Sequence, residues 1–335
     1  MPISINISAS RGAAILGLSK WKTPVQSWLE IMESREPGFC EKHNYELPVF
    51  EYNAAMRWGH AFENSIIELA ENKIGIEIVE REQLYTKDFL TCHIDGRYHI
   101  GDVLHEGKTT NFRYYRENFG EPGTDRVPVE YQIQCQHQMI CTGAEKVILS
   151  VLVFPRMVTD FEEIGWEIVP YNNDYDIQKI IDGKVSCVSP IAWARTLNEM
   201  GYFHTYEIIA NRDLQLLMIE KYTDFWNNHV LTGIPPEAKS YDDIRALVRE
   251  PIGTIIANDE IVRLMSEFKN IGSEISTTGP LAKRREQIKV DVLKYMASAG
   301  AVLDDESKDK FILRDNTGKK IASYGNNKNG IFSFR

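Results

Sequence analysis

Hydrophobic residues along this 335-residue chain follow two different periods, which predicts a protein that mixes helices and strands. Apolar positions three or four residues apart indicate amphipathic helices, and short runs rich in Val, Ile and Leu indicate strands. The predicted helices span residues 11–16, 23–32, 53–72, 129–141, 175–181 and 214–228. The predicted strands span residues 75–84, 90–93, 101–109, 147–154 and 165–169. The last-but-one strand is almost continuously apolar, as is typical of a strand buried on both faces.

Two of the predicted helices contain polar residues at positions that suggest a function. Glu63 lies near the middle of the helix predicted at residues 53–72. In the helix predicted at 129–141, Tyr131, Gln134 and Gln138 are spaced so that they share one face. Side-chain amides can hydrogen-bond phosphate or orient a water without adding charge, although a surface helix can also contain glutamines without a function.

The C-terminal part has a different pattern. Residues 258–296 read as helical, and residues 311–335 as a hairpin-like end. Four basic residues fall on one predicted helix: Lys283, Arg284, Arg285 and Lys289. They form either a solvated helical face or a contact for DNA or a protein partner. We predict a first domain over residues 1–230 and a C-terminal extension over residues 231–335.

Composition narrows the class of protein. The apolar fraction of 43% and the charged fraction of 26% are ordinary for a globular protein. The N-terminus lacks the pattern of a signal peptide, and no apolar run approaches the length of a membrane span, so we expect a cytoplasmic protein with no membrane association. The five cysteines are odd in number and scattered, which argues against a disulfide framework and a zinc ribbon.

The segment CHIDGRYHIGDVLHEGK contains the clearest candidate chemistry. Glu106 and Lys108 are two apart on a predicted strand and therefore share a face, and Asp95 precedes them on an adjoining strand. Carboxylate oxygens suit Mg²⁺ or Mn²⁺ better than zinc, and such an ion can polarise a phosphate and generate hydroxide. The same pattern also arises by chance, as a charge pair on a strand edge.

A net charge of −10 is unusual for a protein that binds nucleic acid. Net charge, however, describes solubility better than it describes one cleft. The segment GKTTNFRYYR contains Lys108, Arg113 and Arg116 with three aromatic residues and no acidic one. The local sign of charge next to Glu106 is therefore positive, although these residues also suit an ordinary helix start.

Four sequence blocks in the right order resemble the YqaJ-like viral recombinase family, which includes lambda-type phage exonucleases and belongs to the PD-(D/E)XK nuclease superfamily. The blocks are ISASRGAAILGLSKWKTP, RWGHAFENSIIELA, HIDG with HEGK, and YQIQCQHQM followed by TG. The resemblance implies a restriction-endonuclease-like α/β core, with a central mixed sheet flanked by helices. It also implies a mainly helical C-terminal extension that ends in a β-hairpin.

The resemblance also implies roles for individual residues. Asp95, Glu106 and the carbonyl of Gly107 match metal ligands, Lys108 matches the lysine that positions or activates water, and Glu63 matches a glutamate that supports a second metal or its water shell. Gln134, with Gln136 close by, matches a glutamine motif near the scissile or terminal phosphate. Ser10 matches a hydroxyl residue that holds a 5′-phosphate, and Arg11 replaces by proximity an arginine that the family often has just upstream. Arg97 and Arg113 complete the DNA-binding residues that we expect.

The activity implied by the resemblance is a 5′-to-3′ exonuclease that uses one or two Mg²⁺ ions, with Mn²⁺ as a possible substitute. It would digest linear duplex DNA and leave 3′ single strands for a single-strand annealing protein. Homo-oligomers, commonly ring-shaped trimers, and a phage or mobile element in a bacterial cytoplasm are further expectations. Two alternatives remain open: an endonuclease of restriction or repair type, and a noncatalytic protein that binds DNA ends as a recombination scaffold.

Overall fold

The continuously apolar strand predicted near residues 147–154 forms the centre of the largest sheet in a computed structural model of the chain. The structure describes residues 6–49, 51–172, 174–181, 184–248, 253–274, 279–302, 310–326 and 332–334. Two compact units are present. We call residues 6–21 and 49–226 the larger unit, and residues 22–48 and 227–335 the smaller unit.

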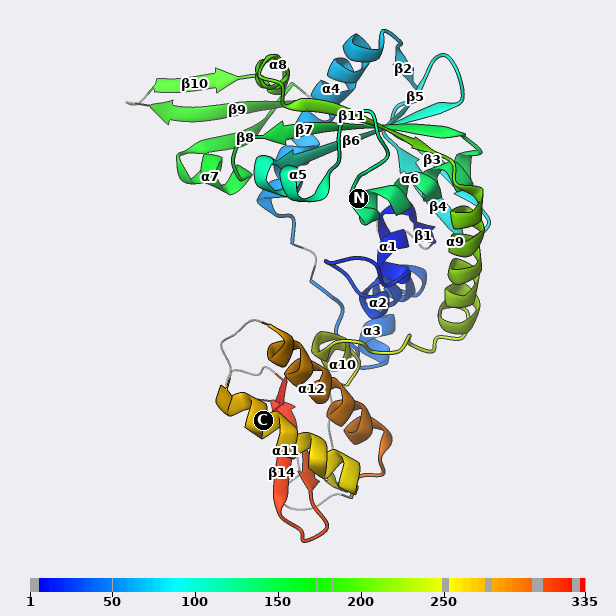
Figure 1. Cartoon of the computed structure of the whole chain (residues 1–335), viewed down its shortest axis with the longest axis vertical. Coiled ribbons are helices and arrows are strands. Elements are labelled where there is room, and N and C mark those ends of the chain that lie inside the picture. Colours follow the sequence, from blue (N-terminus) through cyan, green and yellow to red (C-terminus); the bar gives the residue numbers. More distant parts are fainter. Residues whose placement is uncertain are drawn as a thin grey trace. The chain divides into compact units, whose positions relative to one another are not determined.

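The main sheet of the larger unit has five strands in the order β11-β7-β6-β5-β2 (Figure 1). These strands are β2 (Ile78–Val79), β5 (Gly96–Tyr98), β6 (Val103–Asn111), β7 (Lys146–Phe154) and β11 (Phe203–Ile209). Only β6 and β7 pair in parallel, and the other neighbours are antiparallel. The sheet is therefore mixed, and the α/β class that the sequence predicts is confirmed.

Two helices cover opposite faces of this sheet. α4 (Ala54–Ile74) begins at the Asn53 cap and ends at Gly75, whereas α6 (Val129–Thr142) ends at Gly143. Both terminal glycines have positive φ, of 76° and 80°, a conformation that favours glycine. Alternate residues of β7 face the two helices: Ile148 and Leu152 pack with α4, and Leu149 and Val151 pack in the core that includes Cys135 and Met139 of α6.

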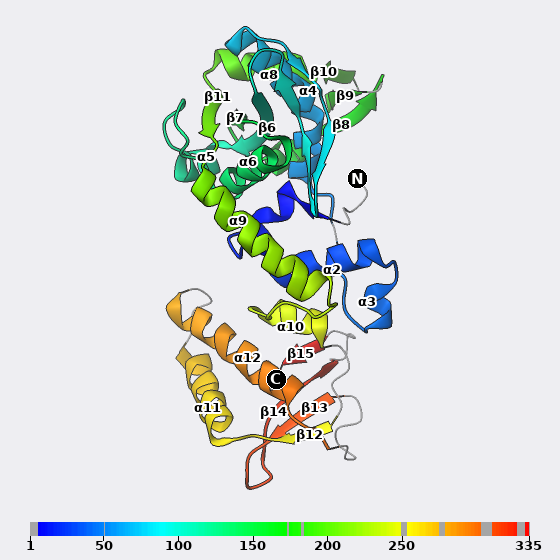
Figure 2. The same cartoon turned by 90° about the vertical axis from the view of Figure 1, so that its right-hand side faces the viewer.

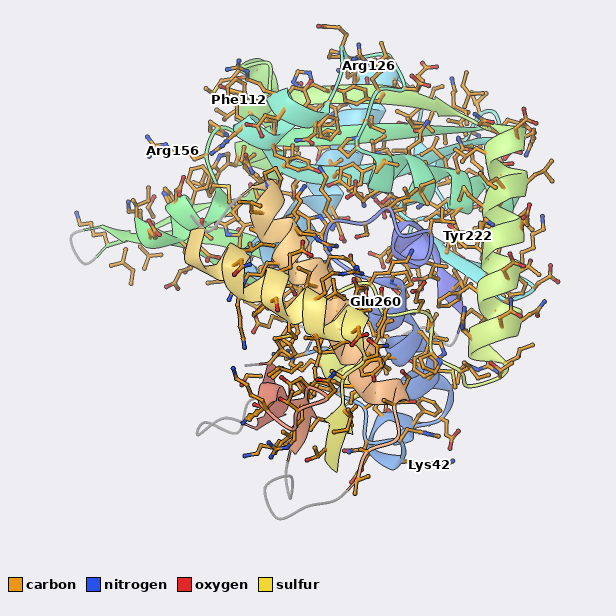
Figure 3. All side chains as sticks on the ribbon, turned by 60° about the horizontal axis from the view of Figure 1, so that its bottom comes forward. Lys42, Phe112, Arg126, Arg156, Tyr222 and Glu260 are labelled. Carbon is orange, nitrogen blue, oxygen red and sulfur yellow. The ribbon has the colours of Figure 1, made fainter. Side chains whose placement is uncertain are left out.

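A second sheet of the larger unit has the order β1-β4-β3. Its strands are β1 (Ile7–Ser8), β3 (Gln83–Lys87) and β4 (Leu90–Ile94). The strand predicted at residues 75–84 is thus interrupted, because Glu80 and Glu82 have positive φ and turn the chain between β2 and β3. The first helix is short: a 3₁₀ turn (Ala9–Arg11) followed by α1 (Gly12–Ile15). α9 (Arg212–Phe225) passes so close to α1 that a Cβ atom at Gly12 would meet the Tyr222 hydroxyl (Figure 3).

The predicted helix at residues 175–181 is wrong. These residues belong to β9 (Asp174–Ile181), the middle strand between β8 (Trp166–Tyr171) and β10 (Lys184–Val188). Ile177 is fully buried and pairs with Ile168 on one side and Val188 on the other. Cross-strand pairing of branched residues decides the structure here. The remaining helices of this unit are α5 (Phe112–Asn118), α7 (Val158–Glu163) and α8 (Pro190–Glu199).

The smaller unit packs helices against a four-stranded sheet with the order β12-β13-β14-β15 (Figure 2). Its strands are β12 (Gly253–Ile256), β13 (Lys310–Arg314), β14 (Lys320–Asn326) and β15 (Phe332–Phe334). Its helices are α2 (Pro24–Arg35), α3 (Phe39–Lys42), α10 (Tyr241–Leu247), α11 (Asp259–Glu274) and α12 (Pro280–Ser298), and a π-helical turn spans Trp226–Val230. The residues predicted as a hairpin-like end form β13 to β15, which pair antiparallel.

The smaller unit is assembled from two separate parts of the sequence. Trp28 in α2 donates its ring N–H to the carbonyl of His229 at 3.0 Å, and the backbone N–H of Glu46 donates to the carbonyl of Ala246 at 2.7 Å. Residues 22–48 therefore group with the C-terminal part, whereas the sequence prediction places them in the first domain, residues 1–230. Among the residues that the structure describes, no helix combines the length and apolar character needed to cross a membrane.

Candidate active site

Glu106 and Lys108 lie on the face of the main sheet that α6 covers. In the parallel pairing of β6 and β7, Glu106 is opposite Leu149 and Lys108 is opposite Val151. Paired residues on adjacent strands project from the same face, and Leu149 and Val151 belong to the core beneath α6. The prediction that Glu106 and Lys108 share a face agrees with this geometry.

Three side chains converge on the carboxylate of Glu106, which is only 2% exposed. The Lys108 ammonium donates to Oε1 at 2.5 Å, and the Gln134 amide donates to the same oxygen at 2.6 Å. The Gln138 amide donates to Oε2 at 2.5 Å and also to the His93 carbonyl at 3.3 Å. A buried carboxylate needs such partners to remain charged.

Asp95 lies beside this carboxylate, at the bend between β4 and β5. Its Oδ2 accepts a hydrogen bond from the backbone N–H of Gly107 at 2.7 Å. A Cβ atom at position 107 would sit 3.1 Å from Ile66 and 3.5 Å from the same Asp95 oxygen. The contact with Asp95 would be an ordinary one, so glycine between Glu106 and Lys108 chiefly allows Ile66 of α4 to pack closely against the strand.

Burial and neighbouring charges shift the pKa values of the site. Burial, together with the negative charge of Glu106, raises the pKa of Asp95 to about 8. Burial by itself would lower the pKa of Lys108, but the charges of Glu106 and Asp95 outweigh it, and the pKa of Lys108 is raised. The Lys108 ammonium also lies 5.5 Å from the centre of the Tyr131 ring. At neutral pH Lys108 is therefore a charged hydrogen-bond donor.

Glu63 projects from α4 and is more exposed than Glu106. Its side chain is 46% exposed and accepts a hydrogen bond from His60 Nδ1 at 3.1 Å. Burial raises the pKa of Glu63, and its charge acts on both Asp95 and Lys108. Glu63 is thus at the edge of the site, within electrostatic range of its centre.

The predicted phosphate-binding residues do not gather at one point. Ser10 is exposed and shares a 3.1 Å hydrogen bond with Ser8, while Arg11 is 8% exposed. Arg97 makes ion pairs with Glu80, at 3.0 Å, and with Asp102, and Arg113 is 86% exposed and pairs with Glu117. The charges of Arg97 and Arg113 are therefore already paired with carboxylates.

Gln136 does not contribute to the site. Gln138 lies beside Gln134 at the position that we expected Gln136 to occupy. Gln136 is fully buried; its amide donates to the Ile209 carbonyl at 2.8 Å and its oxygen accepts from Asn211 N–H at 3.0 Å. Two residues correspond to about 200° around a helix, so Gln136 faces away from Gln134. Gln138 is four residues from Gln134 and shares its face of the helix. This spacing in the sequence was the signal that could have identified Gln138 as a site residue.

The residues present fit a magnesium site of the kind that keeps several waters. Across the parts of the chain that the structure describes, no three His, Cys, Asp or Glu side chains are grouped to hold a metal ion. Mg²⁺, however, commonly uses one or two carboxylates and completes its shell with waters and backbone oxygen. Two carboxylates close enough to raise the pKa of Asp95 form a donor set that a divalent cation would stabilise.

Part of the chain matches a known protein family. Residues 4–145 match the YqaJ-like viral recombinase domain family. The resemblance found in the sequence is confirmed over these residues, which include Asp95, Glu106, Lys108, Gln134 and Gln138. The chain is 27% identical over 154 residues to the uncharacterized protein YqaJ of Bacillus subtilis (strain 168). That alignment covers 44% of this chain and 43% of the relative, so the chain spans less than half the length of the relative it matches.

Two solved structures are similar to parts of this chain. One is an alkaline exonuclease (LHK-Exo) from Laribacter hongkongensis, with a TM-score of 0.42 and 17% identity, covering 69% of this chain and 90% of that one. The other is a phage related exonuclease from Haemophilus somnus 129PT, with a TM-score of 0.43 and 16% identity, covering 68% of this chain and 96% of that one.

Proposed function

We propose that the larger unit is a metal-dependent deoxyribonuclease of PD-(D/E)XK type that digests linear duplex DNA from the 5′ end. The observation that supports this most directly is the convergence of Lys108, Gln134 and Gln138 on the buried Glu106 beside Asp95. This cluster lies within residues that match a recombinase domain, and recombination acts on DNA ends.

Asp95, Glu106 and the carbonyl of Gly107 are the groups that would hold Mg²⁺, or Mn²⁺ in its place, with Glu63 available for a second ion. When bound, such an ion lowers the pKa of a coordinated water and neutralises charge on the phosphate. Gln134 and Gln138 hold the Glu106 carboxylate in one orientation, as outer partners of metal ligands commonly do.

Lys108 acts in this proposal as a charged donor that positions the attacking water and stabilises negative charge on the phosphate. The raised pKa of Lys108 favours this role over that of a general base, because a base must first lose its proton. Tyr131 packs beside the ammonium and limits its freedom.

Further parts of the proposal rest on the family resemblance. They are 3′ single-strand products passed to a single-strand annealing protein, a homo-oligomer such as a ring trimer, and action in a bacterial cytoplasm. Binding of the 5′-phosphate by Ser10 and Arg11, on the first helical turns, is also part of the proposal and rests on the resemblance alone.

Digestion of end-labelled duplexes in Mg²⁺ tests the proposal. Substrates are a linear duplex with a 5′-phosphate, the same duplex with a 5′-hydroxyl, and a covalently closed circle. We expect digestion of the linear DNA from the 5′ end and no digestion of the circle. In Lys108→Ala, Mg²⁺-dependent digestion should be lost while DNA binding is retained. The exposed Lys184→Ala is the matched control. Cutting of the circle would indicate an endonuclease, and binding without any digestion would indicate a scaffold.

A further inference from the structure

Three neighbouring strands of the smaller unit place a lysine, a glycine and a serine in one row. Lys310 of β13 is opposite Gly325 of β14, and Gly325 is opposite Ser333 of β15. Residues opposite each other on adjacent strands project from the same face of a sheet. Because Gly325 has no side chain, the row has an amine at one end, a hydroxyl at the other and a gap between them.

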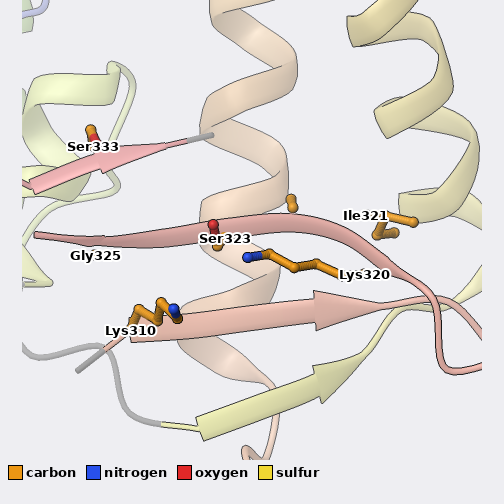
Figure 4. A pocket seen from close by; sticks show the side chains of 7 residues that line it. Lys310, Lys320, Ile321, Ser323, Gly325 and Ser333 are labelled. Carbon is orange, nitrogen blue, oxygen red and sulfur yellow. The ribbon is translucent and has the colours of Figure 1, made fainter. Parts of the chain in front are cut away.

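This gap is part of a hollow of about 430 Å³ on the sheet. Besides the three residues of the row, its lining comprises Lys320, Ile321, Ala322 and Ser323. Figure 4 shows Lys310, Lys320 and Ser323 around this stretch of β13 and β14, with the Lys320 side chain extending toward Ser323. The hollow thus combines two amines, two hydroxyls and a floor of small residues.

The two lysines differ from the basic residues on the helices of the same unit. Arg284 pairs with Glu267 at 2.7 Å, Lys289 with Glu286 at 2.9 Å and Lys294 with Glu237 at 2.7 Å. For Lys310 and Lys320, no carboxylate of the described residues is within ion-pair distance. Two of the four residues of the predicted basic patch on α12, Arg284 and Lys289, are therefore paired with carboxylates, whereas Lys310 and Lys320 have no such partner among the described residues.

Ser333 adds evidence for a polar ligand. Its hydroxyl oxygen is buried, and it has no hydrogen-bond partner among the described atoms. A buried polar group without a partner costs free energy, so such groups often mark a place where a ligand or water binds. An oxygen-rich anion in the hollow would accept a hydrogen bond from this hydroxyl and from both amines.

Three aromatic residues of these strands point to the opposite face. Phe311, Tyr324 and Phe334 pack in the core with residues of α11 and α12. None of the residues lining the hollow is aromatic. Proteins that hold single strands by their bases stack them on exposed aromatic rings. The hollow is therefore suited to phosphate rather than to bases.

Charge along the sequence points in the same direction. The smaller unit contains 20 Lys and Arg against 20 Asp and Glu, whereas the larger unit contains 18 against 28. The net charge is thus 0 in the smaller unit and −10 in the larger unit. A polyanion such as DNA is therefore repelled by the larger unit as a whole, outside the local positive charge near Lys108, and is not repelled by the smaller unit.

We propose that the hollow between Lys310, Lys320, Ser323 and Ser333 is a second DNA-binding site that holds backbone phosphates without reading sequence. The choice of DNA as the polyanion rests on the proposed function. The site itself is distinct from the carboxylate cluster and contains none of its residues.

The test measures DNA binding by the full-length protein without divalent metal, so that no digestion occurs. The variant Lys310→Ala/Lys320→Ala is compared with Lys269→Ala/Lys283→Ala, which removes the same charge from exposed positions on α11 and α12. We expect the first variant to weaken binding roughly tenfold and to lower the dependence of log affinity on log salt by about 2, equally for unrelated sequences. The control should change binding less than twofold.

A second variant, Gly325→Val, fills the hollow and leaves the charge unchanged, and it should weaken binding in the same direction. Equal losses in the sheet and helix variants would overturn the proposal, because they would show a general charge effect. Selective competition by inorganic phosphate at matched ionic strength would also overturn it, in favour of a site for a small phosphate compound. Short single-stranded and duplex probes identify the form of DNA that is bound. Weaker binding of either probe by the Lys310→Ala/Lys320→Ala variant supports the proposal.

This result is separable from the proposed function. If Lys108→Ala and the wild type digest no DNA but the sheet variants still lose binding, the nuclease proposal fails and the second site stands. If digestion occurs as expected and the sheet variants bind normally, the second site fails alone.

Discussion

Among the described residues, the most deeply buried carboxylate of each unit is satisfied in an opposite way. Asp243, in the smaller unit, accepts backbone N–H groups of Lys239 and Ser240 at 2.9 and 3.1 Å, and the Thr23 hydroxyl at 2.5 Å. Glu106, in the larger unit, accepts only from side chains, namely Lys108, Gln134 and Gln138.

The difference is the one expected between a carboxylate buried for structure and one buried in the proposed active site. Asp243 is part of the capping box of α10 and also bonds Thr23, which caps α2, so it joins the starts of two helices. Around Glu106, in contrast, hydrogen-bonding capacity is left over, because the Gln138 oxygen is buried without a partner among the described atoms. Unsatisfied groups of this kind are expected where a ligand completes the site.

The largest expected effect comes from Glu106→Gln. This substitution keeps the shape but removes the charge, and DNA digestion should fall roughly 10³-fold or more, equivalent to about 4 kcal/mol in the barrier. Initial rates on linear duplex in Mg²⁺ measure it, with Glu117→Gln on the exposed face of α5 as the control. Retention of more than a tenth of the activity would contradict the role of Glu106 as a ligand.

The contrast within α6 comes next. Gln138→Leu should lower digestion about 10- to 100-fold, because an outer partner of a metal ligand is lost. Gln136→Leu should leave digestion per folded molecule within twofold and lower the free energy of unfolding by about 1–3 kcal/mol, because the Asn211 N–H and Ile209 carbonyl lose their partner. Urea unfolding and initial rates are measured on both variants. Equal effects of Gln138→Leu and Gln136→Leu would refute the distinction between a site residue and a structural residue.

Asp243→Ala sharpens the comparison from the other unit. It removes the acceptor for two backbone N–H groups and for Thr23, and the free energy of unfolding should fall by about 2 kcal/mol. Digestion per folded molecule should stay unchanged well below the midpoint of unfolding. A loss of turnover without a loss of stability would show that Asp243 is more than a capping residue.

The pKa of Asp95 predicts how metal binding depends on pH. Because this pKa is raised to about 8, Asp95 holds a proton at pH 7 in the metal-free protein and must release it when Mg²⁺ binds. The apparent affinity for Mg²⁺ should therefore fall about tenfold per pH unit below pH 8 and level off above it. Calorimetry in buffers of different ionisation enthalpy counts the released proton. Affinity that is constant from pH 6 to 9 would rule out this linkage.

The smallest effect is expected for Arg284→Gln. Its ion pair with Glu267 is exposed, and such pairs contribute little to stability because water screens the charges. Thermal unfolding and DNA affinity should both change little. A large drop in affinity would restore the helical basic patch as a DNA contact and weaken the case for the sheet.

Residues that depend on local spacing could be predicted from the sequence, and residues that depend on pairing partners could not. Glu106 and Lys108 share a face because they are two positions apart on a strand, and Gln134 follows from its position in α6. The error at Gln136 was one of helical geometry, since Gln138 is four residues from Gln134 and Gln136 is two. Helical spacing at residues 175–181 was misleading because β8 and β10 supply the burial of Ile177.

The grouping of residues 22–48 with the C-terminal part also has no local signal. It depends on contacts such as Trp28 to His229, which are about 200 positions apart in the chain, and composition does not change at residue 22 or 48. The Arg97 and Arg113 predictions show a related limit, because a basic residue is free for phosphate only if no carboxylate reaches it first.

The discontinuity of the smaller unit has a consequence for inheritance. A module appended at one end of a gene can be gained or lost by a single fusion, and each half then folds as before. Here α2 and α3 are encoded between the first helix and α4 of the larger unit, while their partners are encoded after residue 226. A stop codon near residue 227 would leave Trp28 and Thr23 without His229 and Asp243, so loss of the C-terminal part would also remove the partners of α2.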